Sequence, residues 1–559
     1  MTQVYRITFL DGDRRIEATA TAGETISDVV RREGFDLNLE CGGRGVCRRC
    51  ALPIQAPGEA APTMRLACQF RIDRDGIVAK VSSPAVDTGA SGETLTLGNR
   101  PEASRDAISP TERDGALGCA VDLGTTTLEC ALVSLATGRI LATASRRNPQ
   151  AAFGRDVISR IAAVSSGSAP RMRELVCETL GEMTHRLAAQ IGAETSQIED
   201  VVVAGNTTME FLFTGRDATP LGVAPFEVGD RVFATRRTSE FPWRVHFAEN
   251  ARVRIFPVFS AFVGGDIVAG FERLRASGVF DDGATLFLDV GTNGETILAA
   301  NGRFYATSTA AGPAFEGAEI TQGSLAIPGA VSRIDYCVRR SYSEDFWRPQ
   351  TIDDLPATSV CGSGLVDALA GFLDYGVVAP SGRLASSGAP SILEEFREEL
   401  SLRLRGEGRR RAALISRLEE RETTGGVWLE QKDVRQAQLA IAAMKTGQRL
   451  LMRSAGFEEA SLARIRLAGT FGGALNSKSA GRVGMFPNIR SGDVEYCGNT
   501  SLLGAIDVLT GKINLKRLED SLNLVETVDL AAIPDFNDFF ALCGRFPTAE
   551  EIGSYGDFL

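Results

Sequence analysis

Four cysteines near the start of the chain are spaced C-x5-C-x2-C-x17-C: Cys41, Cys47, Cys50 and Cys68. The first three lie in the segment CGGRGVCRRC, whose glycines let backbone amides turn toward the sulfurs of a metal cluster. Four thiolates are the ligands of a [2Fe–2S] cluster, although the plant-type pattern has one residue fewer in its first gap. The alternatives are a zinc site or buried thiols, but a zinc ribbon needs two C-x-x-C pairs and this segment has one. The spacing therefore predicts a [2Fe–2S] cluster.

Two turns of related sequence each place an aspartate beside glycine and threonine. DLGTTT at 122–127 follows an apolar strand pattern, and DVGTNGE at 289–295 follows the apolar run 284–290. An aspartate at the end of a strand, facing turn amides and hydroxyls, can hold phosphate oxygens and hydrated Mg²⁺. One such turn is also compatible with an ordinary β-hairpin, whereas two copies predict half-domains that face each other across a phosphate-binding cleft. The predicted contact residues are Asp122, Gly124, Thr125, Thr126, Thr127, Asp289, Gly291, Thr292, Asn293 and Gly294.

A third glycine turn, LAGTFGG at 467–473, follows the strand pattern RIRLA and predicts a platform for a nucleoside. Glycines would let adenosine approach the backbone closely. The predicted contact residues of this turn are Gly469, Thr470, Gly472 and Gly473.

Further polar residues between these turns are candidates for the same site. Asn206 and Thr207 follow an apolar strand pattern, and Asp266 precedes a helix of small residues; packing alone is the alternative for all three. Glu316, in GPAFEGA, is a candidate for polarising the attacking water, and a helix cap or salt bridge is the alternative.

The elements that must position the cysteines come first in the chain. Residues 3–10 and 14–20 are predicted to be paired strands, followed by a capped helix from Thr25 to Arg32. This order resembles the β-grasp ferredoxins, and LACQF at 66–70 resembles the segment that carries their last cysteine. We therefore expect a [2Fe–2S] ferredoxin-like domain over residues 1–82.

Three further segments follow this domain. Residues 83–115 are rich in Ser, Thr, Gly, Ala and Pro and are predicted to form a flexible linker. Residues 116–200 are predicted to be the first ATPase segment, with the first phosphate hairpin, and residues 201–559 the ATPase domain. Within the latter, a core helix is predicted over 431–451 and a pair of solvated helices over 391–424.

Composition excludes several classes of protein. The net charge of −11 argues against nucleic acid as the main partner. No apolar run approaches the roughly 20 residues that span a bilayer, so we expect no membrane segment. Seven cysteines scattered outside the motif predict reduced thiols and a cytoplasmic location. The chain has two histidines, His185 and His246, which lie far apart in the sequence and in no motif. This argues against a hydrolase that uses a histidine-based triad or zinc site.

The three glycine turns together resemble the phosphate-1, phosphate-2 and adenosine motifs of the actin, sugar kinase and Hsp70 ATPase superfamily. With the N-terminal cysteine motif and GNTTM, AFEGA, CGSG and GNTSLLGA, nearly the whole chain resembles the reductive activators of corrinoid proteins. The resemblance implies an α+β multidomain fold: a β-grasp ferredoxin domain, a linker, and an α/β ATPase with ribonuclease H-like halves.

The resemblance also implies a function. Such an activator transfers one electron from its [2Fe–2S] cluster to the inactive Co(II) of a corrinoid methyltransferase protein and restores Co(I), with ATP and Mg²⁺ as cofactors. Asp122 and Asp289 would position Mg²⁺ and the attacking water, and Glu316 would assist. An upstream low-potential electron donor and a homodimer are further expectations.

Two other classes of function stay open from the sequence. A small-molecule kinase with a fused ferredoxin module would transfer phosphate without using the cluster. A nucleotide-gated redox sensor would bind nucleotide without sustained hydrolysis. The sequence shows neither a sugar-binding signature nor a DNA-binding module.

Overall fold

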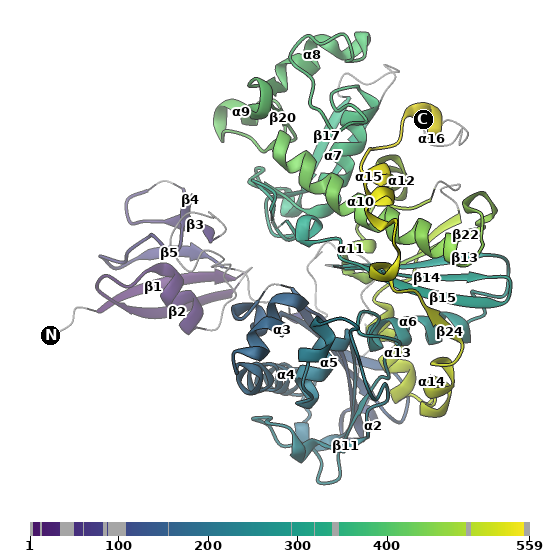
Figure 1. The fold of residues 1–559 in the computed structure, drawn as a ribbon. Coiled ribbons are helices and arrows are strands. Elements are labelled where there is room, and N and C mark those ends of the chain that lie inside the picture. The colour runs from purple at the N-terminus through teal and green to yellow at the C-terminus, as the bar shows by residue number, and fades with distance from the viewer. Residues whose placement is uncertain are drawn as a thin grey trace. The chain divides into compact units, whose positions relative to one another are not determined.

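The computed structural model describes residues 4–11, 14–33, 50–59, 61–81, 86–87, 108–154, 156–291, 293–317, 319–337, 346–487 and 493–552. They divide into two compact units, Met1–Thr88 with Ala144–Arg147, and Gly89–Thr143 with Asn148–Leu559. Figure 1 shows the fold of the chain. No helix within these ranges is both long and apolar enough to cross a bilayer.

The first unit is built on a five-stranded sheet with the order β2-β1-β5-β3-β4. Strands β1 (Val4–Asp11) and β2 (Arg14–Thr21) form the expected antiparallel pair, and the expected helix follows as α1 (Ile26–Arg32). The other strands of this sheet are β3 (Ala51–Gln55), β4 (Thr63–Leu66) and β5 (Ile77–Lys80), which runs parallel to β1. The two-residue strand β6 (Val86–Asp87) is not part of this sheet. Alternate residues of β1, Ile7 and Phe9, point into a small core that also contains Cys50 and Cys68.

The second unit begins with a sheet whose strands include β7, β8 and β9 as a meander. Within this unit its strands follow the order β11-β12-β10-β7-β8-β9. They are β7 (Leu117–Leu123), β8 (Thr127–Ser134), β9 (Ile140–Arg147), of which residues 140–143 belong to this unit, β10 (Ile198–Gly205), β11 (Arg236–Arg237) and β12 (Arg252–Ile255). β7 pairs antiparallel with β8 and parallel with β10. The helices of this half are α2 (Pro110–Arg113), α3 (Val157–Ser165), α4 (Ala169–Gln190) and α5 (Thr207–Thr214), and α4 packs against β8 and α5.

A second sheet repeats this arrangement. Its order is β23-β22-β13-β14-β15-β24, formed by β13 (Thr285–Val290), β14 (Gly294–Ala300), β15 (Arg303–Thr309), β22 (Arg464–Ala468), β23 (Val494–Tyr496) and β24 (Val525–Thr527). β13 pairs antiparallel with β14 and parallel with β22, as β7 does with β8 and β10. The repeated topology places the 122–127 and 289–295 turns at equivalent ends of two similar sheets.

Two helices cross between the sheets (Figure 1). They are α6 (Gly265–Ala276) and α13 (Thr500–Leu509), and a Cβ at Gly504 would lie 2.6 Å from the carbonyl oxygen of Ala269. One hydrophobic core joins these helices to both sheets, with Ala120 from the first and Phe287 from the second.

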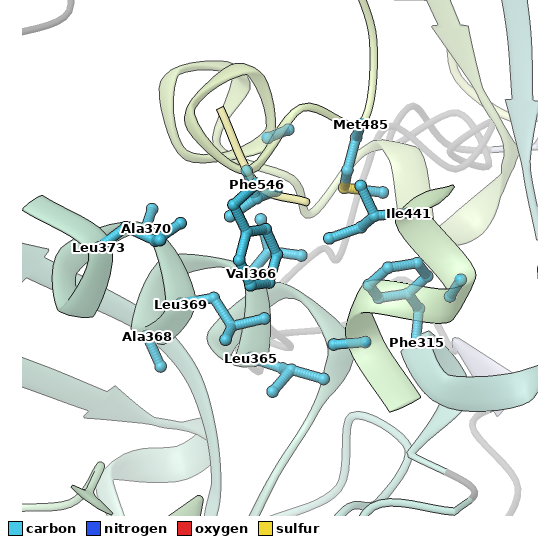
Figure 2. Packing of buried hydrophobic residues seen from close by; sticks show 14 of the residues in the cluster. Phe315, Leu365, Val366, Ala368, Leu369, Ala370, Leu373, Ile441, Met485 and Phe546 are labelled. Atoms are coloured by element: carbon cyan, nitrogen blue, oxygen red, sulfur yellow. The ribbon is translucent and has the colours of Figure 1, made fainter. Parts of the chain in front are cut away.

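The largest core lies around α7 (Gly362–Asp374) and α10 (Gln431–Ser454), where the predicted core helix of 431–451 is confirmed. Figure 2 shows Val366 and Leu369 of α7 near Ile441 of α10 and Phe546. The surrounding elements are β16 (Ala330–Tyr336), β17 (Trp347–Thr351), β18 (Ser359–Val360), β21 (Trp428–Glu430), α11 (Gly469–Gly472), α12 (Ser477–Val483), α15 (Phe536–Cys543) and α16 (Ala549–Ile552). Helix α14 (Leu515–Ser521) instead packs against α6, and its Leu518 belongs to the core between the two sheets.

The segment 391–424 differs from its prediction as a pair of solvated helices. It contains α8 (Arg397–Leu402), β19 (Leu404–Arg405), β20 (Ala412–Leu414) and the single turn α9 (Glu420–Thr423). Leu400 and Leu414 are fully buried. The prediction is wrong because the charged run RGEGRRR dominates the local pattern, whereas the apolar residues that pack into cores occur singly around it.

Candidate functional site

The turn between β7 and β8 is held by side chains from three other segments. It requires Gly124, because a Cβ would lie 2.4 Å from the first backbone carbonyl of β8. Asn148 Nδ2 donates to the Gly124 carbonyl at 2.8 Å, and the Arg160 guanidinium donates to the Thr125 carbonyl at 2.6 Å. Asn206 Nδ2 donates to Thr125 Oγ1 at 2.7 Å. The predicted residue Asn206 therefore does lie at this turn.

The turn between β13 and β14 closes on itself. The Gly291 amide donates to the Asn293 carbonyl at 3.0 Å, and the Thr309 hydroxyl donates to the Gly294 carbonyl at 3.1 Å. Asn293 is half-buried at the end of the sheet. Thr292, predicted to contact phosphate, lies outside the described residues.

Three carboxylates at the ends of these elements raise one another's pKa. Burial and the neighbouring Glu129 raise the pKa of Asp122 to about 7. Burial raises the pKa of Asp289 to about 7, and the charge of Asp122 adds to this increase. Burial likewise raises the pKa of Asp266 to about 7, and the charge of Asp289 adds to it. Mutual repulsion of buried carboxylates is relieved when a cation lies among them.

Such a donor set fits a magnesium ion that is delivered with phosphate. Among the described residues, no three His, Cys, Asp or Glu side chains converge closely enough to enclose a metal ion by themselves. Mg²⁺ keeps several waters and takes one or two carboxylates plus phosphate oxygens, which matches a site of this kind.

A hydrogen bond joins the two halves of the second unit beside the first turn. Thr126 Oγ1 donates to Glu316 Oε2 at 2.8 Å, and Glu316 is the last residue of a 3₁₀ turn, Pro313–Glu316. The buried Arg160 lies near enough to Glu316 for their charges to interact. This geometry places Glu316, the candidate for polarising water, directly at the 122–127 turn.

The third glycine turn lies against the second aspartate. Gly469 has φ +86°, and a Cβ there would lie 2.6 Å from Asp289 Oδ1. Tyr496 OH donates to the Gly469 carbonyl at 2.9 Å, which fixes the turn. Phe471 stacks on Phe315 with ring centroids 5.2 Å apart, so the turn also contacts the 3₁₀ turn that carries Glu316.

The other predicted residues of this turn and its surroundings have different environments. Gly472 and Gly473 close the short helix α11, and Thr470 lies within it. Thr207 is fully buried, and its hydroxyl donates to the Ser260 carbonyl at 2.7 Å. This environment agrees with the alternative interpretation, in which Thr207 serves packing. Thr127 opens β8 and is half-buried.

Two residues that sequence reasoning did not single out contact Asp122 directly. Asn499 Nδ2 donates to Asp122 Oδ2 at 2.7 Å, and Ser501 Oγ donates to Asp122 Oδ1 at 2.8 Å. They lie in GNTSLLGA, where an asparagine before an apolar helix is a typical N-cap signal. That signal predicts the cap but not the contact with a residue so distant in the sequence.

In the first unit, two of the four motif cysteines lie in the described residues. Cys50 and Cys68 are buried, and their Sγ atoms are 3.1 Å apart. Cys41 and Cys47 lie outside the described residues. Two sulfurs bound to one tetrahedral metal ion at about 2.3 Å are ~3.8 Å apart, so the observed pair fits a shared metal ion with a small adjustment.

Most of the second unit matches two known protein regions. Residues 117–275 match the family described as the RACo middle region, and residues 283–553 match the C-terminal domain of RACo, the ASKHA domain. The chain belongs to the RACo family of reductive activators of corrinoid proteins. The turns at 122–127, 289–295 and 467–473 therefore fall within RACo regions, and the resemblance inferred from the motifs is confirmed.

Relatives of this RACo family member cover most of its length. It is 27% identical to the corrinoid activation enzyme RamQ of Eubacterium limosum, over 93% of this chain and 96% of that protein. It is 24% identical to a [Co(II) methylated amine-specific corrinoid protein] reductase of Methanosarcina barkeri, over 76% of each. A solved structure of a reductive activator for a corrinoid, iron-sulfur protein has the same fold, with a TM-score of 0.66, 24% identity and coverage of 98% of this chain and 100% of that one.

Proposed function

We propose that this chain is an ATP-dependent reductive activator that returns the Co(II) of a corrinoid protein to Co(I). The observation that carries this proposal is that residues 117–275 and 283–553, which contain both carboxylate turns, match RACo regions. Relatives named for corrinoid activation and corrinoid reduction support the same reaction. The reaction class also agrees with a chain that combines paired buried thiols with an ATPase.

We further propose that the first unit is a ferredoxin-like domain whose Cys41, Cys47, Cys50 and Cys68 hold a [2Fe–2S] cluster. Such a cluster supplies one electron at a time when it is bound. The five-stranded sheet with a helix after its first hairpin supports a β-grasp arrangement, and the close Cys50 and Cys68 thiols support a shared metal site. This chain's contribution is to bury those sulfurs, because Cys50 is 1% and Cys68 is 6% exposed.

An ATPase suits such a protein because the reduction of Co(II) to Co(I) needs an input of free energy. Each 59 mV of unfavourable gap costs about tenfold in a one-electron equilibrium, and a plant-type cluster lies near about −400 mV. Reduction of a more negative Co(II)/Co(I) couple is therefore incomplete without help. Nucleotide binding supplies that help only if the ATP and ADP forms bind the partner differently.

The residues of the second unit would use ATP by holding its phosphates from two sides. Asp122 and Asp289 would orient Mg²⁺-bound phosphate, and the turns that follow them would donate hydrogen bonds. Glu316 reaches the first turn from the second half, through its hydrogen bond with Thr126. A nucleotide that displaces or tightens this contact would change how the two halves are joined, which is one way to signal nucleotide state to a partner.

The decisive experiment follows cobalt directly under anaerobic conditions. The reduced protein is mixed with a Co(II) corrinoid methyltransferase protein from the same source, and the Co(I) absorption band is recorded with and without Mg-ATP. We expect the band to appear only with Mg-ATP. An intact cluster and active ATP hydrolysis without any Co(I) would contradict the assignment for that partner and favour a kinase.

The proposal extends to the partners of this protein. The partner would be a corrinoid protein of a methyltransferase system, and an upstream low-potential protein would reduce the cluster. A homodimer and a cytoplasmic location complete the proposal; the latter rests on cysteines that are scattered singly along the sequence.

A further inference from the structure

The Asp122 carboxylate is held at both oxygens by the last part of the chain. Asn499 donates to Oδ2 and Ser501 donates to Oδ1, at 2.7 and 2.8 Å. We propose that Asn499 and Ser501 are positioning residues of the ATP site, which fix the Asp122 carboxylate in the orientation that ATP hydrolysis requires. The inference rests on the proposed ATPase function of this site.

Both the oxygen and the nitrogen of the Asn499 side-chain amide form hydrogen bonds. Its Oδ1 accepts a hydrogen bond from the Leu502 amide at 2.9 Å and so caps α13. Its Nδ2 donates to Asp122 and also to Glu129 Oε2, at 3.0 Å. Asp122 and Glu129 face each other across β7 and β8, so the amide lies between two carboxylates that would otherwise repel each other. Hydrogen bonds at both Oδ1 and Nδ2 hold the Asn499 side chain in one rotamer.

Ser501 completes the arrangement from the next part of the same helix. Its hydroxyl donates to the second carboxylate oxygen, and the residue is 4% exposed. A carboxylate that accepts hydrogen bonds at both oxygens from one rigid element cannot rotate about its terminal bond without losing one of them. Orientation of this group therefore depends on α13.

The element that carries both donors is itself fixed by close packing. At its crossing with α6, a Cβ on Gly504 would lie 2.6 Å from the Ala269 carbonyl oxygen, and one on Gly270 would lie 2.7 Å from Thr500 Oγ1. α6 begins beside Asp266, whose charge also acts on Asp122. Functional groups held within a small tolerance by packed helices are typical of preorganised sites.

The test separates carboxylate positioning from helix capping. Asn499→Asp keeps an oxygen that caps α13 but replaces the Nδ2 donor with an acceptor facing Asp122. At saturating Mg-ATP we expect kcat for phosphate release by the full-length protein to fall about 10- to 100-fold, the usual effect of losing a supporting hydrogen bond at a metal site. KM for ATP should change little, because the glycine turn that faces the nucleoside is untouched.

Two further variants act as controls. Asn514 caps α14 by accepting from the Arg517 amide at 2.9 Å, and its side chain is exposed, so Asn514→Asp tests the same substitution at an ordinary cap. We expect wild-type kcat for it. Ser501→Ala should lower kcat, and Ser501→Thr, which keeps the hydroxyl, should restore most of the rate.

The outcomes distinguish this inference from the function on which it rests. Wild-type kcat in both Asn499→Asp and Ser501→Ala would overturn the positioning role while leaving the ATPase intact. A loss that merely follows a lower unfolding temperature, and that Ser501→Thr shares with Ser501→Ala, would also overturn it. If the wild-type protein releases no phosphate from Mg-ATP, the proposed function fails and this inference fails with it.

Discussion

Single buried carboxylates beside the two turns should make the stability of the nucleotide-free protein sensitive to pH. Burial and Asp122 raise the pKa of Asp289 to about 7, whereas an aspartate in an unfolded chain has a pKa of about 3.9. The folded chain therefore binds this proton more tightly than the unfolded chain. The free energy of unfolding then falls as the pH rises from about 4 to about 7 and is level above that range.

The substitution Asp289→Asn removes this titration and tests whether the free energy of unfolding falls as the pH rises. We expect the variant to unfold at a higher temperature than the wild type at pH 8, with the difference shrinking toward pH 4, where wild-type Asp289 is protonated. Thermal unfolding followed by circular dichroism without nucleotide measures it. Asp281→Asn, at an exposed position, is the control. A difference that is the same at pH 8 and pH 4.5 would contradict the prediction.

Gly469 should tolerate no side chain. Alanine there would adopt φ +86° and place its Cβ 2.6 Å from Asp289 Oδ1. Displacing a catalytic carboxylate by about 1 Å can cost about 100-fold in rate, and we expect Gly469→Ala to lose ATP hydrolysis on that scale. Gly302→Ala is the matched control, because Gly302 has φ +71° and a Cβ there would have no atom within 4 Å. Equal rates in the two variants would show that the steric contact with Asp289 does not matter.

At the scale of whole elements, the crossing of α6 and α13 should respond strongly to one methyl group. A Cβ at Gly504 would meet the α6 backbone, and such overpacking typically costs about 1–3 kcal/mol. We expect Gly504→Ala to lower the free energy of unfolding by that amount and to reduce ATP hydrolysis. Urea denaturation and phosphate release measure the two effects.

The control for this change is a glycine in the middle of another helix. Gly181 lies within α4, where a Cβ would be 3.3 Å from a Val245 methyl group that can move aside. Gly181→Ala should be neutral or stabilising, because alanine is favoured over glycine in a helix by about 1 kcal/mol. Equal destabilisation by both substitutions would rule out the helix crossing as the cause.

Some elements can be predicted from the sequence because their signals are local. The first hairpin, the strand before Asp289 and the helix 431–451 have clear periodicity, and the structure contains them as β1 and β2, β13 and α10. The turn chemistry at 122–127 is also recognisable, since Asp, Gly and Thr residues are adjacent there. The segment 391–424 is not predictable in this way, because its buried residues pack against distant elements.

The same limit applies to the site. Glu316 is a candidate by its motif alone, and its hydrogen bond with Thr126 depends on how the two halves pack. Asn499 and Ser501 reach Asp122 only through the position of α13. Local sequence can show which residues suit a chemistry, but partners brought together from distant positions require the tertiary structure.

At the scale of the whole molecule, electron transfer and ATP hydrolysis should be separable. Cys68 is buried beside Cys50 in the first unit, whereas the turns at 122–127 and 289–295 belong to the second. We expect Cys68→Ser to abolish Co(I) formation and to leave ATP hydrolysis near the wild-type rate. Cys177→Ser, at a buried cysteine of α4, should leave both intact. Loss of ATP hydrolysis in Cys68→Ser alone would show that hydrolysis depends on the cluster.

The contact between Asn499 and Asp122 spans 377 positions of the chain. A ribosome adds about 5–20 residues per second, so Asp122 is synthesised roughly 20–75 s before its partner. During that interval the first half can form its strands but lacks the donors that hold Asp122. A nascent chain, or a fragment truncated before α13, would therefore have an incomplete ATP site, and ATP would not be consumed by unfinished protein.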